Sequence, residues 1–169
     1  NNPCTDVARD AWYYDAVRYV SENGLMSGTG EGIFSPNLTT TRGMVVTILW
    51  RLEGSPETAG GTDFPDVGPS AWYRQAVRWA SDQGIVAGYE NGLFGPDDAM
   101  TREQLAAVLY QYARYKGYDT TASGELSGYQ DADQISSYAL AAMEWANGAG
   151  LITGTDAGTL NPRGSTTRA

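Results

Sequence analysis

The chain has 169 residues, of which 41% are hydrophobic, enough for one domain with a packed core. Its formal net charge is −9, so long-range repulsion disfavours non-specific binding to nucleic acid or to an anionic membrane. With no histidine and one cysteine, Cys4, it cannot build the usual zinc sites or a Ser-His or Cys-His catalytic pair, and we expect no catalytic residue, metal or cofactor.

The sequence repeats itself, and the repeat defines the elements that we predict. Motifs of a first copy recur 60 residues later in a second copy, and most of those recur 66 residues later in a third. We predict one domain, 1–169, of three repeats with the bounds 1–54, 62–117 and 128–169. The segments 55–61 and 118–127 are rich in turn-forming residues and are the predicted linkers.

Each copy is expected to begin with a helix, because apolar residues recur there at three- and four-residue spacings. These residues are Tyr13, Val17 and Val20 in the first copy, and Trp72, Ala76, Trp79 and Ala80 in the second. The helices are expected to end at Gly24, Gly84 and Gly150. In the third copy, Tyr138 lies near the position of the tryptophans.

A second helix is expected after the Thr-Arg pair of the first two copies, where apolar residues again share one face. Thr101 and Gln104 have the spacing of a capping box, whereas Met44 stands at the second position in the first copy. Compact loops separate the two helices of a copy, with Gly32 and Gly92 as expected left-handed turn positions and room for a short β-bridge.

The third copy reaches Arg168 and one further residue. We therefore expect its second helix to come from a continuation of the chain or from another protein chain. Without that helix, a seam beside the third copy would be exposed, since about four apolar side chains, each contributing roughly 1.5–3 kcal/mol, would be absent.

The order of these motifs, Asp-Val, Trp-Tyr, Ala-Val, Gly-x-Phe-x-Pro and Thr-Arg, resembles the surface-layer-homology repeat of bacterial envelope proteins. The match spans nearly the whole chain, and three tandem copies are usual in that family. The resemblance implies an all-α fold in which three helix-pair repeats form a pseudo-threefold bundle, with short loops between the helices. It also implies a location on the bacterial cell surface, in the cell wall or S-layer.

The resemblance further implies grooves between copies that hold a secondary cell-wall polysaccharide, often through a pyruvylated and hence anionic sugar. By position, Arg42, Arg102 and Arg168 are the candidates for the acid, and Trp12 and Trp72 for the sugar ring. A guanidinium matches a carboxylate, and a helix start adds unpaired amides. Gly28, Gly88 and Gly154 are candidates for close approach of a sugar, although a tight turn explains them equally well.

Structural alternatives stand beside these assignments. The arginines could be solvated residues at helix starts, and the tryptophans could fill the core. Asp6, Asp66 and Asp131 are expected to bind backbone amides rather than a ligand. Adjacent Asp97 and Asp98 lack the facing arrangement that glycoside hydrolysis requires.

Some positions depart from the family pattern, which usually has Ala-Glu after Thr-Arg. Gly43-Met44 and Glu103-Gln104 stand there instead, so the groove of the first copy is the least secure, and Tyr138 and Leu160 alter the third copy. Cys4 lies where the ends of a closed bundle would approach each other, so it is either half of a disulfide with a cysteine beyond Ala169 or a lone thiol.

The leading prediction is a non-covalent cell-wall anchoring module that binds an anionic wall polysaccharide and is not an enzyme. The alternative is a module for protein–protein interaction or surface-lattice assembly. A second alternative is the anchoring part of a larger hydrolase that acts on the wall. The sequence predicts no nucleic-acid or membrane partner.

Overall fold

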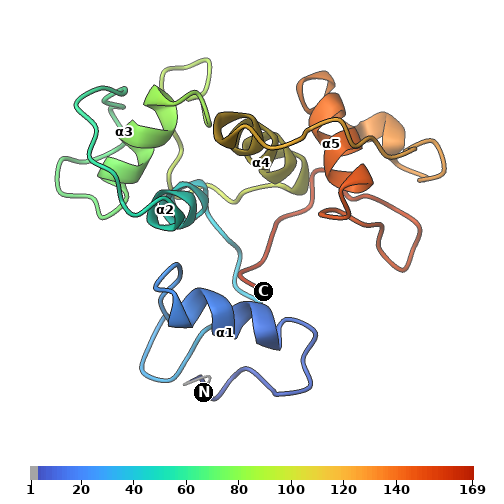
Figure 1. Cartoon of the computed structure of the whole chain (residues 1–169), viewed down its shortest axis with the longest axis horizontal. Coiled ribbons are helices and arrows are strands. Elements are labelled where there is room, and N and C mark those ends of the chain that lie inside the picture. The colour runs from blue at the N-terminus through green and yellow to red at the C-terminus, as the bar shows by residue number, and fades with distance from the viewer. Residues whose placement is uncertain (1–3) are drawn as a thin grey trace.

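A computed structural model describes residues 4–169, in which helices are joined by loops (Figure 1). The α-helices are α1 (Tyr14–Glu22), α2 (Arg42–Leu52), α3 (Arg74–Asp82), α4 (Arg102–Lys116) and α5 (Leu140–Gly148), and the 3-10 helices are η1 (Ala132–Gln134) and η2 (Ser137–Ala139). The residues described contain no multi-residue strand; isolated β-bridges occur, including one between Gly30 and Ile33 in the first loop. The predicted all-α fold is confirmed.

The predicted helix ends and caps are confirmed. Gly24, Gly84 and Gly150 follow α1, α3 and α5 with φ values of 66°, 70° and 75°, a left-handed conformation that glycine adopts without steric cost. At the start of α4, Thr101 and Gln104 form both halves of a capping box. At the start of α2, only the Thr41 side chain caps, by accepting from the Met44 amide.

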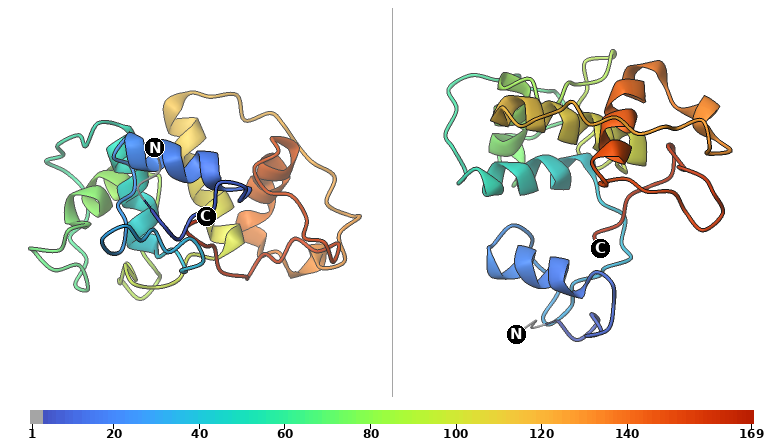
Figure 2. Two further views of the ribbon diagram at one scale, coloured as in Figure 1. Left: turned by 90° about the horizontal axis from the view of Figure 1, so that it is seen from below. Right: turned by 45° about the vertical axis from the view of Figure 1, so that its right-hand side comes forward.

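The helices pack between copies. α2 packs against α3, and α4 packs against α5, so the second helix of one copy lies on the first helix of the next. Figures 1 and 2 show α1 on its own side of the molecule, away from α3, α4 and α5. The loop before each second helix carries it to the neighbouring copy, where the Arg42 and Gly43 amides donate to the carbonyls of Asp98 and Pro96, both at 2.9 Å.

The three copies also meet in a closed ring of backbone hydrogen bonds. The amide of Thr40 donates to the carbonyl of Thr166 at 2.8 Å, the amide of Thr166 donates to Met100 at 2.9 Å, and the amide of Met100 donates to Thr40 at 2.9 Å. These residues occupy equivalent positions just before the three arginines. The ring therefore fixes the Thr-Arg segments of all three copies against one another.

The buried apolar residues form one large and two smaller clusters. The largest lies between α2, α3 and α4 and includes Val46, Trp79 and Phe94, while the second joins α4 to α5 and includes Met143 and Leu160. The third belongs to the first copy and contains the buried residues Val7, Val17, Met26 and Phe34. The third copy is thus packed against α4.

The open face lies on α1, in the first copy. Val17 is the buried residue of α1, whereas Ala16 is exposed and Tyr19 is 57% exposed. At the position of Tyr19, Trp79 of α3 is 2% exposed, because it lies in the core cluster formed with α2 and α4. The seam expected beside the third copy is therefore misplaced: α2 covers α3 and α4 covers α5, and within residues 4–169 α1 is the first helix of a copy on which no second helix packs.

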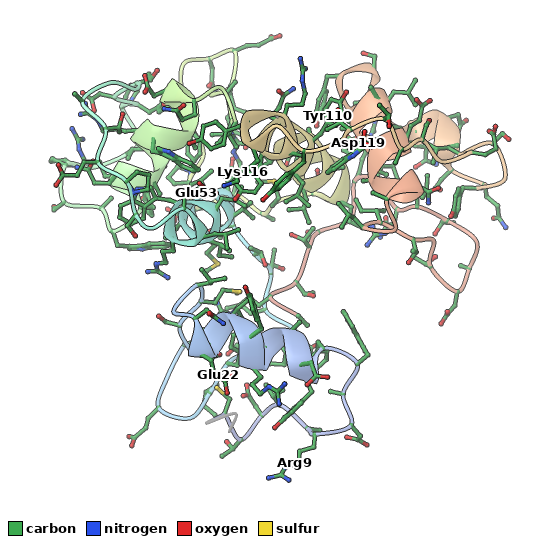
Figure 3. The ribbon with its side chains drawn as sticks, viewed as in Figure 1. Arg9, Glu22, Glu53, Tyr110, Lys116 and Asp119 are labelled. Carbon is green, nitrogen blue, oxygen red and sulfur yellow. The ribbon has the colours of Figure 1, made fainter. Side chains whose placement is uncertain are left out.

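A polar cluster ties the end of α2 to α4. Glu53 forms an ion pair with Lys116 at 3.1 Å and accepts a hydrogen bond from the Tyr112 hydroxyl. Figure 3 shows Glu53 and Lys116 facing each other between α2 and α4. None of the helices in the described part of the chain is long and apolar enough to cross a membrane.

Candidate functional site

The arginine of each Thr-Arg pair reaches into a loop of another copy. Arg42 donates from Nε to the carbonyl of Phe94 at 2.9 Å and from Nη2 to Ala87 at 3.0 Å. Equivalent pairs of carbonyls receive Arg102, at Leu160 and Thr153, and Arg168, at Phe34 and Ser27. The contacts run from the first copy to the second, from the second to the third, and from the third back to the first. Each arginine therefore has a structural role, and these bonds use two of its five donors.

The aspartates hold the same loops from the other side. Asp6 accepts the amides of Phe34 and Ser35 at 2.8 and 2.7 Å, and Asp66 and Asp131 do the same in the second and third copies. The hydrogen bond from the Phe34 amide is the main cause that lowers the pKa of Asp6. The expectation that these aspartates bind backbone amides is confirmed.

Two cavities lie beside the arginines. The first groove, of about 270 Å³, is bordered by Arg168, the loop 25–29, α2 and Trp72. The second groove, of about 950 Å³, is bordered by Arg42, the segment 84–90, α4 and Tyr138. The loop residues, helices and aromatic rings occupy equivalent repeat positions in the two grooves. Each groove is thus built from all three copies.

The predicted site residues divide between these grooves. Arg168, Gly28 and Trp72 come together in the first groove, and Arg42 and Gly88 come together in the second. The other candidates, Arg102, Trp12 and Gly154, line neither cavity. Each of the two grooves has as one wall the second helix of the copy whose loop it contains. Arg102 contacts the loop of the third copy, for which residues 4–169 contain no second helix.

The tryptophans lie at the surface. Trp12 is 84% exposed and Trp72 is 58% exposed, and each ring packs edge-on against the tyrosine that follows it. The alternative that they fill the core is therefore wrong. An exposed ring at the wall of a groove offers a flat apolar face to a ligand, and Trp72 has this position.

The glycines of the loops are required by the chain's own packing. A Cβ on Gly28 would lie 2.5 Å from the Ile33 carbonyl oxygen, and a Cβ on Gly88 would lie 2.4 Å from Cε1 of Phe64. Gly154 is restricted in the same way by Tyr129, at 2.4 Å. Tight packing therefore explains these glycines without a sugar, and their contact with a ligand stays a prediction.

The environments of the arginines differ between the grooves. Arg42 is 5% exposed, and its guanidinium carbon lies 4.6 Å from the ring centre of Tyr89 and 4.8 Å from that of Phe94. Arg168 is partly exposed and lies over the ring of Phe34 at 4.6 Å. Burial lowers the pKa of both arginines, but a guanidinium stays charged at any physiological pH.

Other groove residues escaped the sequence analysis because they do not recur. Arg51 lines the first groove, and Gln111 stands at its position in the second. Tyr89 lines the second groove, and Thr29 takes its place in the first. The only sequence signal at these positions is that the residue differs between equivalent positions of the first two copies.

Glu103 gives the third copy a contact of its own. Its carboxylate is buried and accepts hydrogen bonds from the amide and the hydroxyl of Ser136, at 2.9 and 2.7 Å. In the first copy, Gly43 stands at this position, and a Cβ there would lie 3.3 Å from the ring of Tyr73. The residue after each arginine thus differs because the two helix starts have different neighbours: the Tyr73 ring beside Gly43 and Ser136 beside Glu103.

The fold and grooves together define a helical repeat domain in which the walls of each groove come from all three copies. The chain belongs to the S-layer homology domain family, whose model matches residues 5–43, 63–106 and 128–169. The recognition of three tandem copies is confirmed. Proteins with this domain are extracellular and associated with the bacterial cell wall, and the domain itself is a non-catalytic anchoring module.

Relatives carry the same region within much longer chains. The chain is 30% identical over 98% of its length to an endoglucanase of Bacillus sp. (strain KSM-635), covering 17% of that protein. It is 31% identical over 91% of its length to the surface-layer 125 kDa protein of Lysinibacillus sphaericus, covering 13% of it. It is 30% identical over 54% of its length to a cellulosome-anchoring protein of Acetivibrio thermocellus, covering 22% of it.

Proposed function

We propose that this chain anchors a protein non-covalently to the cell wall by binding an anionic, pyruvylated secondary polysaccharide in its grooves. The observation that carries the proposal is the first groove, where Arg168 and Trp72, from different copies, border one cavity. A guanidinium pairs with a carboxylate, and an indole face packs on a sugar ring. The net charge of −9 does not oppose this, because charges beyond roughly 8 Å are largely screened at physiological salt.

The proposal includes a pseudo-threefold arrangement of the repeats 1–54, 62–117 and 128–169. The cyclic contacts of Arg42, Arg102 and Arg168 and the ring of backbone hydrogen bonds support it. Under this arrangement, Arg102, Trp12 and Gly154 belong to a third groove. A helix placed on α1 as α2 is placed on α3 would complete that groove.

The exposed face of α1 is also a candidate contact surface for a partner helix. The exposed side of α1 at Ala16 and Tyr19 would accept a helix, supplied by a further segment of the same protein or by another chain. Covering these residues would remove apolar surface from water. A disulfide of Cys4 remains a separate prediction. The Cys4 side chain packs against the core cluster of the first copy.

Two other functions have specific observations in their favour. The open face of α1 favours a protein-interaction or lattice-assembly module. The second candidate is the anchoring part of a larger wall-acting hydrolase, which agrees with the names endoglucanase and exoglucanase among the relatives. In both cases the grooves themselves would carry out no chemistry.

A binding titration tests the proposal. Purified wall polysaccharide, before and after removal of its pyruvyl groups, is titrated into the chain and into Trp72→Ala and Trp12→Ala variants. We expect tight binding only of the pyruvylated polymer, weakened by Trp72→Ala and unchanged by Trp12→Ala, whose ring lines neither groove. Binding that ignores both the pyruvyl groups and Trp72 would instead favour a protein partner.

A further inference from the structure

The two grooves differ in the charges that line them. Arg168 and Arg51 both line the first groove, and its lining contains no carboxylate. The second groove contains Arg42 together with Glu90, and neutral Gln111 replaces the second arginine. The formal charge of the lining is therefore two positive charges in the first groove and zero in the second.

Neither arginine of the first groove forms an ion pair with a carboxylate among the described residues, although the charge of Asp6, which holds the Phe34 and Ser35 amides, acts on Arg168. The ion pairs of residues 4–169 involve Arg18, Arg74, Arg78 and Lys116. Arg51 donates from Nη1 to the Leu25 carbonyl at 3.4 Å, a long and weak hydrogen bond, and Leu25 is itself part of the groove wall. Both guanidinium groups thus border the same small cavity with donors to spare.

In the second groove, two aromatic rings lie close to the arginine. The ring centres of Tyr89 and Phe94 lie 4.6 and 4.8 Å from the guanidinium carbon of Arg42, and the Tyr89 hydroxyl donates to the Asp98 carboxylate at 2.8 Å. The equivalent positions in the first copy are Thr29 and Leu38, which supply neither the ring nor the carboxylate. Arg42 therefore contacts two rings and is acted on by the charges of Asp98 and Asp66, whereas Arg168 contacts the single ring of Phe34 and is acted on by the charge of Asp6.

We infer that the two grooves select different sugars: the first groove binds the acidic sugar of the polymer through Arg168 and Arg51, and the second binds a neutral sugar. This inference rests on the proposed function and adds to it the class of ligand at each groove. A carboxylate on a sugar gains from two nearby guanidinium groups and loses little to repulsion in the first groove. In the second groove, Glu90 of the lining opposes the same carboxylate.

The sizes of the cavities agree with this division. The first groove, about 270 Å³, lies just below the range of about 300–1,000 Å³ that is usual for ligand pockets, and so suits a single sugar residue. The second groove, about 950 Å³, has room for a longer piece of neutral chain. One polymer carrying both kinds of residue would occupy the two grooves at once and gain affinity from the rigid link between them.

The test uses two probes that differ only in the acid: a methyl glycoside with a 4,6-O-pyruvate ketal and the same glycoside without the ketal. Amide and indole NMR signals of the chain report which groove each probe occupies. We expect the ketal to shift signals of residues 25–29 and the Trp72 indole, and the neutral glycoside to shift those of 84–90. Shifts of 84–90 by the ketal at equal or lower concentration would overturn the assignment.

Matched variants isolate the second arginine. Arg51→Gln gives the first groove the neutral residue of the second and is expected to weaken ketal binding about 5- to 10-fold, the effect of one charge-assisted hydrogen bond, without changing neutral-probe binding. Arg18→Gln removes the same charge from an exposed site outside both grooves and is expected to change neither. Gln111→Arg combined with Tyr89→Thr is expected to create ketal binding at 84–90.

These experiments distinguish a failure of the groove assignment from a failure of the proposed wall anchoring. Ketal binding at 25–29 that Arg51→Gln leaves intact would overturn the role of Arg51 while retaining the proposed function. Failure of the unaltered chain to bind both the probes and the intact polysaccharide would overturn the proposed function together with this inference. Circular dichroism and melting curves of each variant show whether its fold is kept.

Discussion

Arg42 and Asp66 bind the two sides of one residue, Phe94, although they come from different copies. Asp66 accepts the amide of Phe94 at 2.9 Å, and Arg42 donates to its carbonyl at 2.9 Å. Asp66 belongs to the copy that contains Phe94, whereas Arg42 belongs to the preceding one. The backbone of Phe94 therefore takes part in a hydrogen bond within its own copy and in a second one that joins two copies.

Loss of the aspartate should loosen both contacts. We expect Asp66→Ala to destabilise the chain by about 1–3 kcal/mol, because the amides of Phe94 and Gly95 lose a charged acceptor. Thermal unfolding followed by circular dichroism measures the change. Asp63→Ala is the control, since the Asp63 side chain is 61% exposed, its ion pairs with Arg74 and Arg78 lie at the surface, and its loss should change stability by less than about 1 kcal/mol.

The cluster of Glu53, Tyr112 and Lys116 predicts a stability that falls at both ends of the pH scale. The hydrogen bond from Tyr112 lowers the pKa of Glu53, so its contribution is present above about pH 4.3, the ordinary value, and is lost as the pH falls through the lower folded value. Burial and the hydrogen bond to Glu53 raise the pKa of Tyr112, so that contribution is complete below about pH 10 and is lost as the pH rises through the higher folded value.

Urea unfolding at a series of pH values tests this prediction. In Tyr112→Phe, the phenol and its hydrogen bond are absent, and we expect the alkaline fall above about pH 10 to be reduced. The acid fall should also shrink, because the pKa of Glu53 returns towards its ordinary range with Lys116 as the remaining partner. An unchanged profile in both limbs would show that the cluster is not formed in solution.

The loop glycines should differ sharply in their tolerance of a methyl group. We expect Gly88→Ala to cost about 1–3 kcal/mol, because its Cβ would lie 2.4 Å from Phe64 and 3.0 Å from the Leu93 carbonyl. Gly68→Ala should change the free energy of unfolding little, since no atom lies within 4 Å of the added Cβ and its φ is not positive. Equal effects of the two substitutions in denaturant melts would contradict the packing described here.

The open face of α1 predicts an asymmetry between equivalent positions. We expect Trp79→Ala to destabilise the chain by about 3–5 kcal/mol, because this side chain is 2% exposed in the main core. Tyr19→Ala, at the same position in the first copy, should cost less than about 1 kcal/mol, because the ring is 57% exposed. Comparable losses at the two positions would mean that α1 is covered in solution.

Local features of this fold could be predicted because they depend on neighbouring residues. Thr101 and Gln104 identify a capping box by spacing alone, and Gly24 marks a helix end by its conformational freedom. The three aspartates could also be assigned to backbone amides, although the amides lie in a loop some 28 residues away rather than at the next helix, as between Asp6 and Phe34.

The pairing of helices and the make-up of the grooves could not be predicted in this way. The repeat defines which residues are equivalent but not which copy a second helix covers, and α2 lies on α3 of the following copy. Trp72 and Arg168 therefore line the same groove although they are 96 residues apart in the sequence. Arg51 and Tyr89 carry no repeat signal, because their equivalents are Gln111 and Thr29.

The ring of hydrogen bonds between Thr40, Met100 and Thr166 also bears on the order in which the parts of the chain fold. Its closing contacts join residues far apart in sequence, as does the bond from Arg168 to Phe34, which spans 134 positions. Such contacts form late, because a long loop must close before they gain any energy. The backbone ring that joins the first copy to the other two therefore cannot close before Thr166 has been added to the chain, and the first groove needs Arg168 as well.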